Sequence, residues 1–228
     1  MGTLSIVATP IGNLEDITLR ALRTLKECDV IYAEDTRVIS KLLARYEIKK
    51  PLQRLDAATE NKKTKEILER LEAGKHVVFV SDAGTPGISD PGARLVRAVR
   101  EHSHILKNVG ITIEAIPGAS ALTAALSIAG VDSTEFTFFG FLPHKKGRQT
   151  ALKKIATSEI PVVLYESPHR ILRLLKELET VEVSRVTIAR ELTKVHEEVV
   201  SGTPSELLAH FSSHPDTVRG EFVVIVTS

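Results

Sequence analysis

Three glycines, two aspartates and two prolines lie within residues 80–92, where they could bind a ligand through the backbone. An apolar run at residues 76–80 precedes this loop, and apolar residues at helical spacing begin at Ala93. Asp90 and Pro91 are residue types preferred at the N-cap and first position of a helix. A glycine-rich turn lets N–H and C=O groups approach a ligand that side chains would otherwise keep away. Ordinary loops also use these residues for geometry, so this loop by itself leaves both interpretations open.

Two further loops of this kind follow predicted strands. The first follows the apolar run at residues 4–8 and contains Thr9-Pro10-Ile11-Gly12-Asn13. The second follows the run at residues 111–116 and contains Pro117-Gly118-Ala119-Ser120-Ala121. Because the carboxyl ends of neighbouring parallel strands meet at one edge of a sheet, we expect the three loops to lie together and form a binding site. The sequence contains neither Gly-x-Gly-x-x-Gly nor Gly-x-x-x-x-Gly-Lys-Ser/Thr, so it supports neither a standard dinucleotide site nor a P-loop.

Strand and helix patterns alternate along most of the chain, which is typical of an α/β fold. We expect the first helix to open at Asp16, with Leu19 among its apolar positions. The alternation restarts after Ile116-Pro117-Gly118, which predicts two α/β domains, residues 1–115 and 116–228. The N-terminal sheet should be mostly parallel. The C-terminal sheet should be mixed, because its last two strands flank a helix.

The composition limits the kinds of partner that the protein can have. The chain has 228 residues, 43% of them hydrophobic and 26% charged, so it can bury a substantial core. Its formal net charge is only +1, so a nucleic acid would have to be held by a local basic patch. Residues 144–154 contain five basic residues and no acidic ones. The five are Lys145, Lys146, Arg148, Lys153 and Lys154. Such a run is either an RNA-binding patch or an ordinary solvated surface.

Several other classes of protein are disfavoured. The single cysteine, Cys28, excludes an internal disulfide and a cysteine-based zinc site, and we expect it to be a small core residue. His210 and His214 have the spacing of a helical zinc pair, but no third ligand is evident, so we expect no metal. The apolar run at residues 4–8 is too short for a secretory signal, and no segment has the roughly 20 apolar residues of a membrane span. We therefore expect a cytoplasmic protein with no membrane partner.

Seven motifs occur in order along nearly the whole chain. They are Val7-Ala8-Thr9-Pro10-Ile11-Gly12-Asn13-Leu14, Ala33-Glu34-Asp35-Thr36-Arg37, Ser81-Asp82-Ala83-Gly84-Thr85-Pro86 with Ser89-Asp90-Pro91-Gly92, Pro117-Gly118-Ala119-Ser120-Ala121, Phe139-Gly140-Phe141-Leu142-Pro143, Tyr165-Glu166-Ser167-Pro168-His169-Arg170 and Gly220-Glu221-Phe222-Val223. Together they resemble the family of bacterial 16S ribosomal RNA ribose methyltransferases, in the tetrapyrrole methylase superfamily. The resemblance implies two α/β domains of the class III methyltransferase type, S-adenosyl-L-methionine in the cleft between them, and a homodimer. Family members commonly continue into a short helical extension beyond the point where this sequence stops.

The resemblance also implies which residues contact the cofactor. They lie on the three N-terminal loops and on segments of the second half: Pro10, Ala83, Gly84, Thr85, Ile88, Ser120, Ala121, Tyr165, Leu192 and Gly220. Thr85 stands where many tetrapyrrole methylases carry an aspartate. Asp82 is near enough in sequence to supply the missing carboxylate, so we include it among the cofactor-binding candidates. An aspartate at the end of a strand also commonly caps the next turn.

The implied reaction is methyl transfer to the ribose 2′-hydroxyl of a cytidine in 16S ribosomal RNA. The attacking oxygen must lie in line with the departing sulfur at about 3 Å. A general base for the weakly acidic hydroxyl typically contributes about 100-fold to 10,000-fold. The candidates are Glu166, Asp35 with its neighbour Arg37, and His169, and we favour Glu166 as base or substrate orienter. Equally, Glu166 and Asp35 could pair with Arg170 and Arg37 and only orient loops.

Two alternative functions remain open at this point. A tetrapyrrole or other small-molecule methylase would share the chemistry, but a compact substrate does not need the basic stretch at residues 144–154. A non-catalytic ribosome-assembly factor would keep the fold and bind RNA only.

Overall fold

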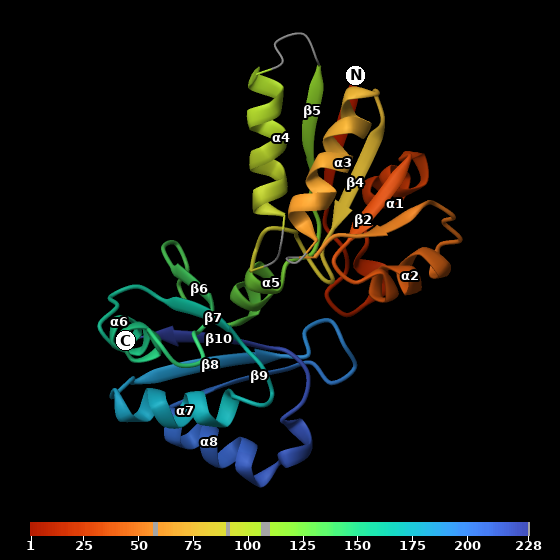
Figure 1. Ribbon diagram of the computed structural model, residues 1–228. Coiled ribbons are helices and arrows are strands. Elements are labelled where there is room, and N and C mark those ends of the chain that lie inside the picture. The colour runs from red at the N-terminus through yellow and green to blue at the C-terminus, as the bar shows by residue number, and fades with distance from the viewer. Residues whose placement is uncertain (57–58, 90–91, 106–109, 228) are drawn as a thin grey trace. The chain divides into compact units, whose positions relative to one another are not determined.

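A computed structural model describes residues 1–56, 59–89, 92–105 and 110–227. They form two compact units, Met1–Ser120 and Ala121–Ser228, each built around a five-stranded sheet (Figure 1). The division falls after Ser120, whereas the sequence placed it after residue 115. The last strand of the first sheet runs to Ile116, and the loop behind it stays with the first unit.

The first unit contains a wholly parallel sheet. Its strand order is β3-β2-β4-β1-β5, and every neighbouring pair is parallel, which confirms the predicted parallel sheet. The elements are β1 (Gly2–Val7), a 3₁₀ turn (Leu14–Asp16), α1 (Leu19–Glu27), β2 (Val30–Ala33), α2 (Thr36–Arg45), β3 (Leu52–Arg54), α3 (Glu60–Glu72), β4 (His76–Val80), α4 (Ala93–Ile105) and β5 (Ile111–Ile116). The three-residue strand β3 is too short to produce a periodic pattern, and the sequence did not predict it. The predicted cap at Asp90 and Pro91 lies outside the described residues.

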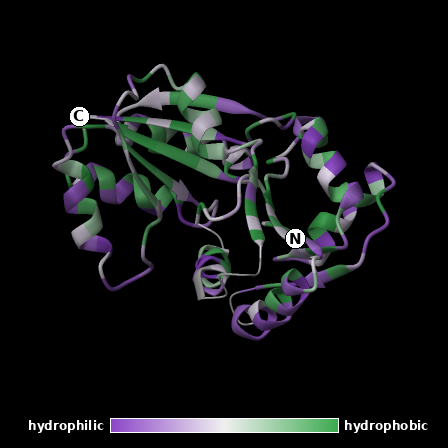
Figure 2. Ribbon diagram, turned by 90° about the horizontal axis from the view of Figure 1, so that it is seen from above, coloured by the Kyte–Doolittle hydropathy of each residue, from purple (hydrophilic) through white to green (hydrophobic). Residues whose placement is uncertain are grey.

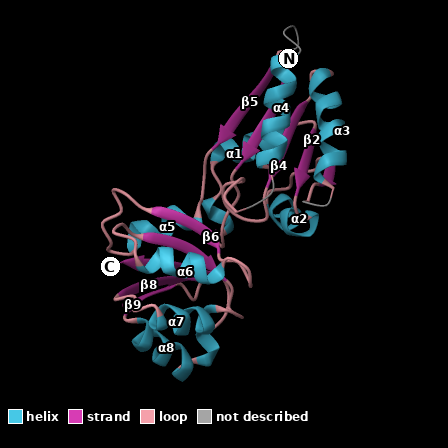
Figure 3. Cartoon of the chain, turned by 60° about the vertical axis from the view of Figure 1, so that its left-hand side comes forward, coloured by secondary structure: helices cyan, strands magenta, loops and turns pink. Residues whose placement is uncertain are grey.

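Helices cover both faces of this sheet (Figure 3). Val7 on one face packs in a cluster with Leu25 of α1 and Ile39 of α2. Phe79 on the other face packs in a cluster with Ile67 of α3, and α4 contacts α3 beside it. Because both faces are covered, the inner strand β2 and residues 77–80 of β4 are apolar and buried. Figure 2, coloured by hydropathy, shows hydrophobic segments along the strands.

The first helix begins later than the sequence predicted. Asp16 ends the 3₁₀ turn, and α1 starts at Leu19, because the Thr18 hydroxyl accepts a hydrogen bond from the Ala21 N–H at 3.0 Å and caps the helix there. Leu19 is 86% exposed, so its expected place on the apolar face was wrong. Cys28, directly after α1, is fully buried, as expected.

The second unit contains a mixed sheet, as predicted. The strand order is β6-β7-β10-β8-β9, in which β6 and β7 are parallel and the other neighbours antiparallel. The elements are α5 (Ala121–Ile128), β6 (Thr137–Phe141), α6 (Arg148–Ala156), β7 (Val162–Glu166), α7 (Ile171–Thr180), β8 (Arg185–Arg190), β9 (Glu198–Gly202), α8 (Pro204–Ser213), a 3₁₀ turn (Pro215–Thr217) and β10 (Phe222–Thr227). Helix α5 packs against β10, on the other side of the sheet from α7 and α8 (Figure 1).

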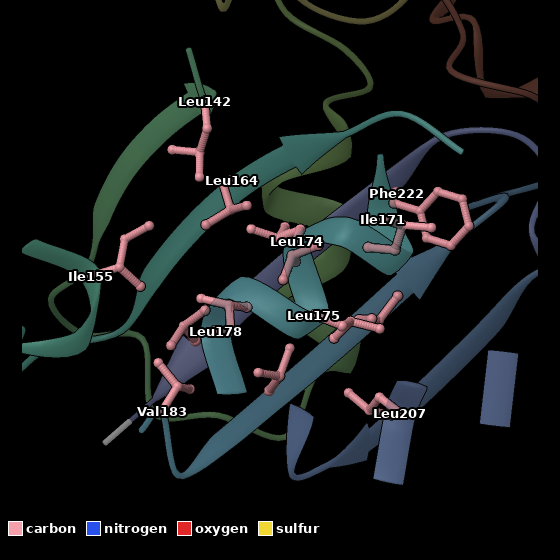
Figure 4. Close-up of a cluster of buried hydrophobic side chains, with 14 of the residues drawn as sticks. Leu142, Ile155, Leu164, Ile171, Leu174, Leu175, Leu178, Val183, Leu207 and Phe222 are labelled. Atoms are coloured by element: carbon pink, nitrogen blue, oxygen red, sulfur yellow. The ribbon is translucent and has the colours of Figure 1, made fainter. Parts of the chain in front are cut away.

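The core of the second unit lies between the sheet and helices α6, α7 and α8. Leu164 and Phe222 point from the strands toward α7, with Leu164 near Leu174 and Phe222 near Ile171 (Figure 4). Burying each such side chain contributes about 1.5–3 kcal/mol, so this layer holds α7 and the loop before it in place. Among the described residues, no helix has both the length and the apolar character needed to cross a membrane.

Candidate functional site

The three glycine-rich loops of the first unit meet, which confirms that expectation. The Thr9 N–H donates to the Gly84 carbonyl at 2.9 Å, and the Gly84 N–H donates to the Thr9 carbonyl at 3.0 Å. The Thr85 hydroxyl donates to the Ala119 carbonyl at 3.1 Å. The loops meet because β4, β1 and β5 are adjacent parallel strands whose carboxyl ends share one edge.

Gly84 lies where these loops are closest. Its φ is +75°, and an added Cβ would lie 3.2 Å from Ile11 Cγ2 and 3.4 Å from the Ala119 carbonyl oxygen. Any other residue would therefore be strained at this φ, and its Cβ would crowd the Ile11 side chain of the first loop. The position requires glycine both for its backbone conformation and for the close approach.

The buried side-chain hydroxyl of Thr9, which pairs with Gly84 through its backbone, has no hydrogen-bond partner among the described residues. The residue is 4% exposed, and its Oγ1 makes no hydrogen bond within the part of the chain that the structure describes. A buried hydroxyl without a partner is costly, which makes Thr9 a candidate for a ligand contact. Thr9 was not among the cofactor-binding residues expected from the sequence, although its hydroxyl directly follows the first predicted strand's apolar run.

A fourth loop, after β2, joins the other three through Asp82. The Oδ1 of Asp82 accepts a hydrogen bond from the Asp35 N–H at 2.8 Å. Asp35 in turn caps α2, since its Oδ1 accepts from the Arg37 N–H at 2.8 Å. Asp82 therefore links two turns, and its expected contact with the cofactor stays a prediction.

Asp35 and Arg37 form an exposed ion pair beside this loop. Arg37 donates Nε and Nη2 to the Asp35 carboxylate, with the shortest contact at 2.5 Å. The side-chain and backbone hydrogen bonds from Arg37 lower the pKa of Asp35 to about 2, and the Asp35 carboxylate raises the pKa of Arg37. At neutral pH Asp35 is therefore ionised and a weak proton acceptor. The Arg37 side chain is 88% exposed, so it can meet an anion from solvent.

The remaining predicted cofactor residues of this unit border the same loops. All are partly accessible, as a ligand contact requires: Pro10, Ala83, Thr85, Ile88 and Ser120.

In the second unit, Glu166 at the end of β7 is enclosed. Its side chain is 0% exposed, and Oε1 lies 2.7 Å from Arg170 Nη2 and accepts from the Ser167 N–H at 2.8 Å. Oε2 lies 3.9 Å from Arg148 Nη2. The pairing with Arg170 that the sequence left open is thus present. His169, between them in sequence, is exposed.

Arg148 corrects the predicted basic patch. The residue is 2% exposed, and its Nε and Nη2 donate to Glu177 Oε2 at 2.8 and 2.6 Å. It opens α6 and turns inward to α7, a pairing between distant segments that a run of like charges does not reveal. The other four residues of the patch are exposed: Lys145, Lys146, Lys153 and Lys154.

The predicted cofactor residues of the second unit occupy three places. Ala121 begins α5, and Tyr165 lies on β7 with its ring 5.0 Å from that of Phe138. The segments that contain Leu192 and Gly220 lie side by side. The N–H of Glu191, one residue before Leu192, donates to the carbonyl of Glu221, one residue after Gly220, at 3.2 Å. Gly220 has a φ of +78°, and an added Cβ would lie 1.7 Å from Glu191 Oε1. Whether these residues bind the cofactor stays a prediction.

Metal ligands do not gather in the described residues. No group of three or more histidine, cysteine, aspartate or glutamate side chains there is placed to hold an ion. His210 of the possible zinc pair instead contacts the Glu198 carboxylate at 3.1 Å.

A family profile and named relatives match nearly the whole of this chain. Residues 3–208 match the profile of the tetrapyrrole (corrin/porphyrin) methylases. The chain is 46% identical over 228 residues to ribosomal RNA small subunit methyltransferase I of Thermotoga maritima, covering 100% of this chain and 99% of that one. It is 44% identical to the protein of the same name from Synechocystis sp., covering 99% of this chain and 79% of that one.

Solved structures show the same fold. The methyltransferase CobJ superposes with a TM-score of 0.72 at 21% identity, covering 100% of this chain and 95% of that one. Uroporphyrin-III C-methyltransferase from Thermus thermophilus, solved with S-adenosylhomocysteine, superposes with a TM-score of 0.64 at 19% identity, covering 100% and 98%. At these identities the likeness establishes the fold.

Proposed function

Because this chain belongs to the tetrapyrrole (corrin/porphyrin) methylase family, we propose that it is an S-adenosylmethionine-dependent methyltransferase that modifies the ribose 2′-hydroxyl of a cytidine in small-subunit ribosomal RNA. The observation that carries this proposal is the full-length similarity to proteins named ribosomal RNA small subunit methyltransferase I. The converging loops of the first unit support the cofactor assignment. The exposed lysines near α6 support the RNA substrate.

The residues of the first unit fit the cofactor. The buried Thr9 hydroxyl lacks a partner among the described residues, and Gly84 brings backbone groups of the loops together. The loops around them expose many backbone groups and few charges, which suits an adenine and a cationic sulfur. We assign cofactor contacts in this unit to Pro10, Ala83, Gly84, Thr85, Ile88 and Ser120, and in the second unit to Ala121, Tyr165, Leu192 and Gly220.

When bound, the cofactor supplies a methyl group on a positively charged sulfur that is a good leaving group. The chain's own task is to hold the ribose hydroxyl in line and to remove its proton. Asp35 is a weak acceptor because its pKa is about 2, and Glu166 is enclosed. We therefore assign proton acceptance to His169, which is exposed and lies three residues after Glu166. Replacing His169 with asparagine should lower kcat about 100-fold or more at saturating RNA. An unchanged kcat would show that His169 does not accept the proton.

The RNA should be held by Lys145, Lys146, Lys153 and Lys154, since the net charge of the whole chain is close to zero. Each phosphate contact to a single strand contributes about −0.7 to the slope of log affinity against log salt. Replacing Lys145 and Lys146 with alanine should make the slope shallower by about 1.4. The matched control is Lys26→Ala, at the exposed end of α1. An identical slope for the double variant and the control would rule out the patch.

The proposed activity is tested directly by methyl transfer. Calorimetry with S-adenosylmethionine comes first, followed by incubation of isolated small ribosomal subunits, or naked 16S RNA, with labelled cofactor. Nucleoside analysis should find 2′-O-methylcytidine. Base methylation, or transfer to a tetrapyrrole in place of RNA, would contradict the proposal, and RNA binding with neither cofactor binding nor methyl transfer would indicate an assembly factor. We also propose a cytoplasmic location and a homodimer, the latter to be checked by sedimentation.

A further inference from the structure

The backbone of the turn that leads into α6 accepts hydrogen bonds from two arginines of the same unit. Arg148 Nη1 donates to the Pro143 carbonyl at 3.2 Å, and Arg170 Nη1 donates to the Leu142 carbonyl at 3.4 Å. Residues 142–147, which we call the basic turn, include the exposed lysines at positions 145 and 146. The backbone at the start of the basic turn is therefore held by guanidinium groups.

Two carboxylates hold these arginines in turn. Glu177 Oε2 accepts from Arg148 at 2.6 and 2.8 Å, and Glu166 Oε1 lies 2.7 Å from Arg170. Oε2 of Glu166, which lacks a hydrogen bond among the described residues, lies 3.9 Å from Arg148. We call Arg148, Glu166, Arg170 and Glu177 the charge cluster, which has two positive and two negative members.

The charge cluster is well enclosed. The side-chain exposures are 0% for Glu166, 3% for Arg148, 16% for Glu177 and 17% for Arg170. Burial raises the pKa of Glu177, but the hydrogen bonds from Arg148 and Arg173 outweigh it and lower the pKa below its usual value. Charge-assisted hydrogen bonds in such surroundings are short and directional, so each arginine has one favoured position.

We propose that Glu166 is a positioning residue, which fixes the basic turn for RNA binding by holding Arg170 and Arg148 against the turn's carbonyls. This inference rests on the proposed function and deepens it. Without the Glu166 charge, the two arginines share one carboxylate and move toward water, releasing the Leu142 and Pro143 carbonyls. The lysines then have to be ordered at the moment of binding, which lowers affinity.

The effect on the basic turn can be measured without RNA. Glu166→Gln keeps the shape of the side chain but removes its charge. The matched control is Arg173→Gln, because Arg173 donates to Glu177 Oε1 at 2.9 Å, is 60% exposed and belongs to the same network without bonding the basic turn. Hydrogen exchange of amides in residues 142–147 should be at least about tenfold faster in the Glu166 variant and unchanged in the control. Equal exchange in both variants overturns the proposal.

RNA kinetics then separate positioning from catalysis. Glu166→Gln should raise KM for RNA about tenfold while kcat at saturating RNA and the Kd of S-adenosylmethionine stay within about twofold of the wild type. Combining it with Lys145→Ala and Lys146→Ala should add little further loss, because both changes act through the same contact. A large fall in kcat with unchanged KM and unchanged exchange would make Glu166 catalytic and overturn the proposal.

A second variant covers the possibility that Glu166→Gln does not fold. Glu177→Gln removes the other carboxylate at a more exposed position and should give the same faster exchange and the same rise in KM. Normal exchange and KM in that variant would contradict the charge cluster's role. If the wild type neither binds nor methylates RNA, the proposed function fails while the exchange measurement still decides what Glu166 does.

Discussion

Thr9 and Gly84 pair in antiparallel fashion, although the strands that precede them, β1 and β4, are parallel neighbours. The chain must therefore reverse direction between Val80, where β4 ends, and Gly84. The reversed segment presents its backbone to the loop after β1, and Thr85 directly behind it bonds the loop after β5. The positive φ of Gly84 is what this reversal requires.

Two glycines of the same loop provide a matched test of the site. Gly84 and Gly87 have φ values of +75° and +88°, so alanine at either position should cost about 1–2 kcal/mol of stability. An added Cβ at Gly87 meets nothing within 4 Å, whereas at Gly84 it meets Ile11 and Ala119. We expect Gly84→Ala to weaken S-adenosylmethionine binding at least about tenfold beyond Gly87→Ala, measured by calorimetry. Equal affinities would remove this loop from the cofactor site.

Thr9 should show opposite effects on stability and on binding. Thr9→Val removes a buried hydroxyl that lacks a partner among the described residues, so the unliganded protein should be as stable as the wild type or up to about 1 kcal/mol more stable. The affinity for S-adenosylmethionine should fall about fivefold to tenfold, because a hydrogen bond to the ligand is lost. Thr9→Ser, which keeps the hydroxyl, is the control for affinity. A valine variant that binds the cofactor normally would show that the hydroxyl does not contact it.

Asp82 can be tested for its link to the neighbouring turn. Its Oδ1 accepts from the Asp35 N–H, and asparagine retains such an oxygen whereas alanine does not. Asp82→Ala should lose about 1 kcal/mol in denaturant unfolding, and Asp82→Asn should stay close to the wild type. Calorimetry with S-adenosylmethionine on the asparagine variant then measures what the Asp82 charge alone contributes to cofactor affinity. Normal cofactor affinity there would restrict Asp82 to joining the two turns.

Cys28 makes stability depend on alkaline pH. Burial raises the pKa of this thiol from 9.0 to about 11. Because the folded pKa exceeds the unfolded value, the stabilisation is complete below about pH 9 and is lost as the pH rises toward about 11. Unfolding experiments should show that Cys28→Ala has a flatter stability profile across this window. In the wild type, the thiol should react with a disulfide reagent at pH 8 only after denaturation. Rapid reaction in the folded protein would contradict its burial.

Much of the fold could be predicted because it rests on local patterns. The apolar run at residues 76–80 is β4 and that at 111–116 is β5, with loops of glycine and proline directly behind them. Strand periodicity depends on neighbouring residues, so it is readable without coordinates. The meeting of the three loops followed from the general geometry of parallel sheets. The start of α1 was missed by three residues because two capping side chains, at Asn13 and Thr18, compete within one short segment.

The amino-acid sequence by itself determined the two α/β units, the character of each sheet, the family resemblance and the loops that could bind a cofactor. The tertiary structure decided which side chains face inward. Arg148 stands in a run of basic residues yet is buried against Glu177, and Glu166 stands in a motif with candidate catalytic residues yet is enclosed and paired with Arg170. Both pairings depend on how α6, β7 and α7 pack together, and a charge gains or loses a partner only when distant segments of the chain are brought within a few ångströms.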